Sequence, residues 1–333
     1  VNMSNPNLRW ERQASVNFGF DFSLKGGKIS GAADYYIRNT SDLLVNRALP
    51  NITGFGSVIT NLGKVDNSGF EFSLNTENLK LNNFIWRSSL AVWSNRNEIV
   101  SLYGKVPVTD ASGNTVLTEQ DDRANGWFIG KNINTIWDFR ILGVWKVEEA
   151  AMARSYGFAP GDFKLDDVNK DGKFTVDDRV FLGQTAPKFN LNLRNEFTIY
   201  KNFDVSFQLY GRFGLLSQFN EAANVDRFYD RAQFYKRPYW TPTNQIDDYA
   251  RMMSSLGSGI GLNVWRKSSF IRVNNVSFAY TTPKRLTDKL KLQSLKVYFN
   301  IQNALTVSPW EYFDPENKGF TPSYGTFGIN MTL

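Results

Sequence analysis

The chain contains many segments in which apolar and polar residues alternate with a period of two. Between Val16 and Leu24 every second residue is apolar, and the residues between them are small or polar. The same pattern recurs in four later segments, 189–199, 203–210, 295–302 and 326–333. Successive side chains of a β-strand point to opposite faces, so each segment predicts a strand with one apolar and one polar face. The pattern therefore indicates an all-β protein.

Two classes of all-β protein produce such alternation, soluble β-sandwiches and transmembrane β-barrels. The predicted strands span about 9–11 residues, enough to cross a bilayer at a tilt, whereas ordinary strands have about 5–6. Aromatic residues lie near strand ends, where membrane barrels carry interfacial girdles; examples are Trp86, Trp93, Tyr200 and Tyr280. Tight connections such as 25–28 and 200–202 alternate with long ones such as 146–188 and 214–269. We therefore predict a transmembrane antiparallel β-barrel with long extracellular loops.

The alternation also predicts which strand side chains face lipid and which face the barrel interior. The assignment is strict, because a register shift of one residue would exchange the two faces. The predicted lipid-facing residues include Phe18, Phe20, Phe22, Leu191, Phe207, Phe299 and Ile329. The predicted interior residues include Asn17, Asp21, Arg194, Gln208 and Asn300.

Loop lengths assign the two sides of the membrane. The short connections, predicted to be periplasmic, are 25–28, 77–83, 200–202 and 282–294. The long connections, predicted to be extracellular, are 46–64, 146–188, 214–269 and 304–323. Segments 84–95 and 134–145 would then both run outward, so we expect an inward strand between them, at 116–129. This gives about 11 strands.

Bacterial single-chain barrels close with an even number of strands, and 11 is half of the 22 in large plugged transporters. An open half-barrel would leave two strand edges unpaired in lipid, where unpaired backbone groups are not tolerated. We therefore expect residues 1–333 to be the C-terminal half of a 22-stranded barrel. Residues 1–10 lack the apolar core of a signal peptide, so we also expect the chain to begin within a longer protein.

Composition removes several classes of function. The chain is 15% aromatic, yet its mean hydropathy is −0.37 and it has no run of 18 apolar residues, which argues against membrane-spanning helices. Because Cys and His are absent, thiolate zinc sites, disulfides and the usual hydrolase triads are excluded. The net charge of +6 is spread among 32 acidic residues without a basic run, so we predict no nucleic-acid partner. Adjacent acids such as Asp121–Asp122 point apart on an extended chain, and we predict that the protein is not an enzyme.

Several short motifs, in this order along the chain, resemble the SusC/RagA family of TonB-dependent outer-membrane transporters. They are the segments at 5–11, 16–21, 29–36, 40–44, 67–71, 239–244, 249–251, 269–276, 297–303 and 312–316. The resemblance spans nearly the whole chain. One departure is the final residue, Leu333, where members of the family usually end on an aromatic residue.

The resemblance implies a nutrient importer in the bacterial outer membrane, surrounded by outer-membrane lipid, that takes up oligosaccharides or peptides. It also implies a SusD-like surface lipoprotein above the extracellular loops and energy coupling by the TonB complex. The plug domain and the segment that contacts TonB would belong to an N-terminal part that this chain does not contain. A structural or secretion-associated barrel without a nutrient substrate remains the alternative.

One segment has the spacing of a calcium-binding loop. Oxygen ligands would come from positions one, three, five, seven and twelve of a twelve-residue loop, with Gly172 at position six for the sharp turn. The predicted Ca²⁺ ligands are Asp167, Asn169, Asp171, the Lys173 carbonyl and Asp178. The alternative is an acidic turn whose side chains cap their own backbone. Members of the family that this chain resembles often carry such a loop, and the resemblance therefore favours a structural Ca²⁺.

Aromatic residues are frequent in the loop at 214–269. Those that could stack on sugar rings or hold peptide side chains are Phe228, Tyr229, Tyr239 and Trp240. They could equally pack the long loop against itself or against a partner protein, and the sequence leaves both readings open.

Overall fold

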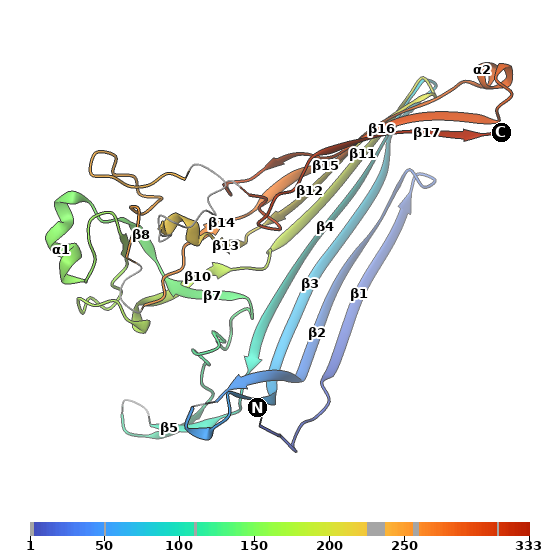
Figure 1. Ribbon diagram of the computed structural model, residues 1–333. Coiled ribbons are helices and arrows are strands. Elements are labelled where there is room, and N and C mark those ends of the chain that lie inside the picture. The colour runs from blue at the N-terminus through green and yellow to red at the C-terminus, as the bar shows by residue number, and fades with distance from the viewer. Residues whose placement is uncertain (1–2, 50, 110–111, 225–236, 256–259, 312) are drawn as a thin grey trace. The chain divides into compact units, whose positions relative to one another are not determined.

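The computed structural model describes residues 3–49, 51–109, 112–224, 237–255, 260–311 and 313–333 (Figure 1). The chain divides into two compact units. The first, here called the sheet unit, comprises 1–133, 187–214 and 269–333. The second, the loop unit, comprises 134–186 and 215–268.

The sheet unit is built on one antiparallel sheet of nine strands (Figure 1). In spatial order the strands are β1 (Arg12–Leu24), β2 (Ile29–Ala48), β3 (Ser57–Leu81), β4 (Phe84–Ser101), β11 (Phe189–Ile199), β12 (Phe203–Phe213), β15 (Phe270–Thr281), β16 (Ser294–Val307) and β17 (Tyr324–Thr332). Every neighbouring pair is antiparallel. The antiparallel all-β prediction is thus confirmed.

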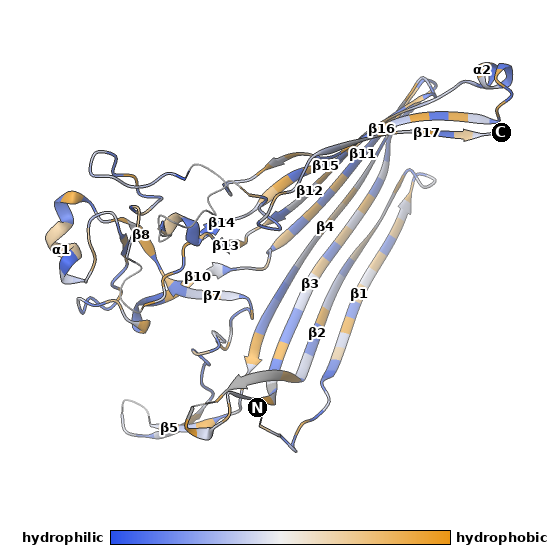
Figure 2. Ribbon diagram, viewed as in Figure 1, coloured by the Kyte–Doolittle hydropathy of each residue, from blue (hydrophilic) through white to orange (hydrophobic). Residues whose placement is uncertain are grey.

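The register extends the alternation of single strands across the whole sheet, because directly opposed residues point to the same side. One row on the apolar face consists of Leu74, Leu90, Leu193 and Leu209. One row on the polar face consists of Glu77, Arg87, Glu196, Ser206, Ser277 and Asn300. Figure 2 shows the alternation along β1 and its neighbours. The predicted separation of lipid-facing and interior residues onto opposite faces is confirmed.

The apolar face has the height of a bilayer. On β3 it runs from Phe70 to Leu81, roughly 36 Å along the strand at about 3.3 Å per residue. A tilt of about 40° reduces this to roughly 28 Å, close to the apolar band of membrane barrels. Large apolar side chains stand exposed on this face, for example Phe20 at 67%. Such exposure suits a surface solvated by lipid.

Part of one row on the apolar face is polar, which the alternation did not predict. Thr76, Ser88 and Asn195 lie directly opposite one another on β3, β4 and β11. Asn195 is only 7% exposed, and its side-chain oxygen accepts hydrogen bonds from Ser88 Oγ at 2.7 Å and Trp86 Nε1 at 2.9 Å. Lipid offers no hydrogen-bonding partners, so polar groups at this depth must satisfy one another.

The strand count differs from the prediction, because nine strands rather than about 11 form the main sheet of the described residues. Strand β4 pairs directly with β11, so the inward strand predicted at 116–129 is not needed. Within 116–129, Glu119 accepts hydrogen bonds from Ser101 and from the Leu102 N–H, and Asp121 accepts one from the Ile129 N–H. These acids fold a loop, which explains why they interrupt the alternation.

The segments between β4 and β11 that were expected to add strands to the barrel form short strands outside the main sheet. Strand β5 (Val106–Thr109) pairs antiparallel with β6 (Thr115–Thr118). Segment 134–145 supplies β7 (Thr135–Phe139) and β8 (Ile141–Val144) to the loop unit. The connection predicted at 46–64 is also shorter, since β2 continues to Ala48 and β3 begins at Ser57.

The loop unit has its own small core. It pairs β7 with β10 (Arg179–Gln184), β8 with β9 (Phe163–Leu165), and β13 (Leu216–Gln218) with β14 (Trp265–Lys267). A short helix, α1 (Ala150–Ser155), and 3₁₀ turns at Val147–Glu149, Val176–Asp178 and Asn220–Ala223 complete it.

The side chains of Trp145 and Phe219 are 1% exposed in this core. Asp162, fully buried, accepts hydrogen bonds from Arg251 Nε and the Ser255 N–H, both at 2.9 Å. Among the described residues, no helix has the length and apolarity to span a membrane.

Candidate functional site

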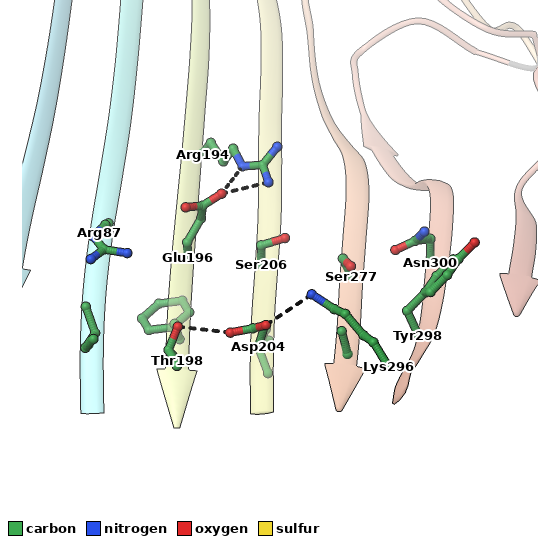
Figure 3. A pocket seen from close by; sticks show the side chains of 14 residues that line it. Arg87, Arg194, Glu196, Thr198, Asp204, Ser206, Ser277, Lys296, Tyr298 and Asn300 are labelled. Carbon is green, nitrogen blue, oxygen red and sulfur yellow. Dashed lines mark hydrogen bonds and ion pairs between the residues drawn. The ribbon is translucent and has the colours of Figure 1, made fainter. Parts of the chain in front are cut away.

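The polar face of the sheet carries a hollow of about 420 Å³ between β4, β11, β12, β15 and β16 (Figure 3). Its charged lining residues are Arg87, Arg194, Glu196, Asp204 and Lys296. Two ion pairs cross this hollow: Arg194 and Glu196 on β11 are 2.7 Å apart, and Lys296 on β16 reaches across β15 to Asp204 on β12 at 3.3 Å. These side chains are roughly half exposed, so the pairs contribute little to stability and leave a wet, mixed-charge surface. Such a surface suits polar solutes or a polar protein segment.

A second cluster lies on the same face, where loop 308–323 between β16 and β17 folds back onto the sheet. Arg272 on β15 forms ion pairs with Asp314 at 2.5 Å and with Glu316 at 3.1 Å. The side chains of Arg272 and Asp314 are 7% and 6% exposed. Arg212 on β12 also contacts Glu316 at 3.2 Å. Arg272 and Asp314 lie in two of the family-like motifs, 269–276 and 312–316, but the sequence alone gives no sign that the two motifs pair.

The environment of loop 308–323 shifts two pKa values. Removal from water acts to raise the pKa of Asp314, but hydrogen bonds from the Glu316 and Asn317 N–H groups and the charge of Arg272 outweigh it, so this pKa is lowered. Removal from water lowers the pKa of Lys318 to about 8, with attraction to Asp314 acting in the opposite direction. The Lys318 ammonium lies 4.0 Å from the centre of the Trp310 ring.

The predicted calcium ligands lie together in one loop whose backbone is arranged by their own side chains. The Asp167 carboxylate accepts hydrogen bonds from the N–H groups of Asp171 and Gly172 at 3.2 and 2.9 Å. Asp178, fully buried, accepts them from Val168 at 3.0 Å and Thr175 at 2.8 Å. Gly172 has a φ of +81°, the left-handed conformation that the sharp turn requires.

Two observations bear on whether this loop fits a cation. Within the described part of the chain, no group of three or more Asp, Glu, His or Cys side chains is arranged to hold a metal ion. Asp167 is also engaged by Tyr156, whose hydroxyl donates to it at 2.8 Å. Partial removal from water raises the pKa of Asp167, but the hydrogen bonds from Tyr156 and the backbone outweigh this and lower it, so Asp167 stays anionic. The turn is formed and charged, and the calcium site stays a prediction.

The predicted substrate-contacting aromatics differ in their surroundings. Phe228 and Tyr229 lie outside the described residues. Tyr239 is 47% exposed, so its ring is accessible on the loop unit. Trp240 is 5% exposed and packs beside Gly161 and Arg251 in the interior of the loop unit. The packing alternative therefore applies to Trp240, while a role of Tyr239 in binding stays a prediction.

Residues 1–304 match the protein family described as "TonB dependent receptor-like, beta-barrel". The chain belongs to this family. TonB-dependent receptor P26 of Formosa agariphila is 33% identical over 331 residues, which cover 95% of this chain and 32% of the relative. TonB-dependent receptor SusC of Bacteroides thetaiotaomicron is 26% identical over 94% of this chain and 30% of its own length. The chain thus spans about a third of the curated relatives it matches.

The fold matches that of a solved membrane transporter. The structure titled "Structure of the RagAB peptide transporter" aligns with a TM-score of 0.73 and 20% identity, covering 99% of this chain and 36% of that chain. This TonB-dependent receptor chain is accordingly part of an outer-membrane β-barrel. The curated relatives are named TonB-dependent receptors.

Proposed function

We propose that the chain forms the C-terminal half of the barrel wall in a TonB-dependent importer of oligomeric nutrients, either oligosaccharides or peptides. The observation that carries the proposal is the polar face, which continues across nine strands and holds mixed charges suited to large hydrated solutes. The similarity to SusC and to the fold of the RagAB peptide transporter supports import. On this proposal the plug and the TonB-contacting segment belong to the rest of the protein.

A SusD-like lipoprotein is the proposed extracellular partner. The support is the similarity to SusC together with two long connections, 214–269 and 308–323, at one end of the sheet. On this proposal each of these connections would offer surface to the lid protein. The exposed Tyr239 is the loop aromatic that we propose to contact substrate or lid.

Uptake of fluorescent oligosaccharides and peptides in the native bacterium tests the proposal. We expect deletion of the gene to abolish uptake of one of the two classes, and deletion of the TonB gene to have the same effect. Re-expression of the full-length protein should restore uptake. Unchanged uptake of both classes by the deletion strain would instead support the alternative, a barrel with a structural or secretion role.

A further inference from the structure

The short connections at one end of the sheet hold the entire excess of positive charge. Turns 25–28 and 200–202 and connection 282–293 contain seven basic residues and one acidic residue, Asp288, a net charge of +6. The basic residues are Lys25, Lys28, Lys201, Lys284, Arg285, Lys289 and Lys291. The whole chain also has a net charge of +6, so the remainder has equal numbers of acidic and basic residues. We refer to these seven residues as the basic rim.

The strand ends that carry the basic rim are joined to their neighbours by hydrogen bonds. The Glu77 N–H donates to the Lys28 carbonyl at 2.7 Å, and the Tyr200 N–H donates to the Asn83 carbonyl at 2.7 Å, so turns 25–28 and 200–202 are each held to an end of the β3–β4 hairpin. The Thr281 N–H donates to the Asn202 carbonyl at 2.8 Å, which links turn 200–202 to the start of connection 282–293. All seven basic side chains are exposed, and none takes part in an ion pair within the described part of the chain. Their charge is therefore available to an external anion.

The connection between β15 and β16 adds an apolar element to this edge. It contains a short helix, α2 (Lys284–Lys289), near the C-terminal end of the chain in Figure 1. Leu286 and Leu290 are four residues apart and 47% and 58% exposed, while Thr287 between them is 1% exposed and anchors the turn. Leucines that point outward among lysines are unfavourable in water but typical of elements that lie at a membrane interface.

The neighbouring turn has the same character. Tyr200 and Lys201 occupy its two central positions with φ of 49° and 64°, where Asn-Gly is preferred. The Tyr200 side chain is nonetheless 67% exposed. Just inside the turn, the rings of Phe203 and Tyr280 are in contact on the apolar face, with centroids 4.7 Å apart and planes tilted by 40°. Aromatic, leucine and lysine side chains thus meet at the level where the apolar band of the barrel ends.

We propose that the basic rim and α2 bind anionic glycerophospholipids of the leaflet that faces the periplasm. Short turns lie on the periplasmic side of membrane barrels, so the rim stands at the headgroups of that leaflet. Lysines and arginines attract anionic headgroups, and the two leucines of α2 enter the region between headgroup and acyl chain. A lipid occupant is favoured over an acidic periplasmic protein because two exposed leucines of α2 accompany the basic residues of the same connection. The inference depends on the orientation of the barrel and not on nutrient import.

Native mass spectrometry of the purified full-length protein tests this assignment. The protein is titrated with phosphatidylglycerol or phosphatidylethanolamine of identical acyl chains, and the bound lipids are counted. We expect wild type to prefer phosphatidylglycerol, and the triple variant Lys284→Gln/Lys289→Gln/Lys291→Gln to lose at least about tenfold in that affinity while phosphatidylethanolamine binding stays unchanged. The preference should weaken between low and high salt.

A matched control removes the same charge from the long loops. The variant Lys105→Gln/Arg154→Gln/Lys267→Gln neutralises three exposed basic residues and should retain the preference for phosphatidylglycerol. If the two triple variants lost phosphatidylglycerol affinity equally, the preference would depend on net charge alone, and the proposal would be overturned. Unchanged lipid binding in the rim variant would also overturn it and leave an acidic protein as the partner.

Two further measurements test the apolar part and the source of the phosphate. Leu286→Ser/Leu290→Ser should weaken phosphatidylglycerol binding while the barrel keeps its heat-modifiable migration on gels, which shows that it is folded. Soluble glycerol phosphate should fail to displace the lipid. Displacement by soluble glycerol phosphate, or full lipid binding by the leucine variant, would contradict a membrane-facing site.

Discussion

At the scale of single residues, Arg272 illustrates how a polar face can hold a buried charge. Its guanidinium is almost fully enclosed by Asp314, Glu316 and the Phe270 ring, so neither charge of the closest pair has access to water. Removal of one partner from such a pair leaves an uncompensated buried charge. We predict that Arg272→Met destabilises the docked loop by about 3–5 kcal/mol. Limited proteolysis at 308–323 and chemical unfolding measure the effect.

Arg194→Gln serves as the control for Arg272→Met. The Arg194–Glu196 pair lies on the same face but is about half exposed, 51% and 47%, and should contribute about 0–1 kcal/mol. Equal proteolysis of the two variants would show that loop 308–323 is held by other contacts.

Lys318 gives a pH-dependent prediction at the same scale. Its pKa of about 8 in the docked loop lies below the ordinary value of 10.5, so the undocked loop binds more protons between these pH values. Docking should therefore become more favourable as pH rises from 8 to 10.5, and the full cost of the buried charge applies below pH 8. Proteolysis of the loop at pH 7.5 and pH 9.5 reports this trend. Lys318→Met should abolish the trend, and weaker docking at pH 9.5 in wild type would contradict it.

At the scale of elements, alternation identified the strands that pair over their full length in the main sheet. β1, β11, β12, β16 and β17 all lie where the apolar period placed them. The segment 116–129 was misassigned because its acids make side-chain hydrogen bonds to the backbone, and strand periodicity carries no information about such contacts. Asn195 interrupts the period of β11, yet the strand persists because Trp86 and Ser88 on β4 satisfy its side chain. These partners are 107 or more residues away in sequence.

The loop at 167–178 is the element whose chemistry is most open to test. We propose that it binds a structural Ca²⁺, since three carboxylates, one amide and one carbonyl have the required spacing. Calorimetry on the full-length protein should detect Ca²⁺ uptake at millimolar concentration or below. We predict that Asp171→Ala removes this uptake and loosens the loop without affecting the sheet strands.

The control for Asp171→Ala is Asp177→Ala, because Asp177 lies in the same loop but outside the predicted ligand set. This variant should bind Ca²⁺ like wild type. Absence of uptake in wild type would reduce the motif to an acidic turn held by its own backbone hydrogen bonds.

At the scale of the whole molecule, the sequence predicted the barrel class and the separation of its faces, but not the position of the long connections. The segments 134–186 and 215–268 form a compact unit with its own core, although β11 and β12 of the sheet separate the two segments in sequence. Residues such as Asp138 organise this unit by accepting hydrogen bonds from Asn263 and Trp265, more than 120 positions later. Periodicity describes local faces and cannot specify such distant partners.

The last prediction concerns the two edges of the sheet. Strands β1 and β17 each have one neighbour in the described residues, and their side chains are exposed along almost the whole strand. Unpaired strand edges are not tolerated in lipid, so both strands need partners from the rest of the protein. We expect residues 1–333, expressed alone behind a signal peptide, to be degraded or to aggregate. The full-length protein should give the heat-modifiable band of a closed barrel. A heat-modifiable, protease-resistant band from the isolated chain would show that β1 and β17 can close on each other and would refute the shared barrel.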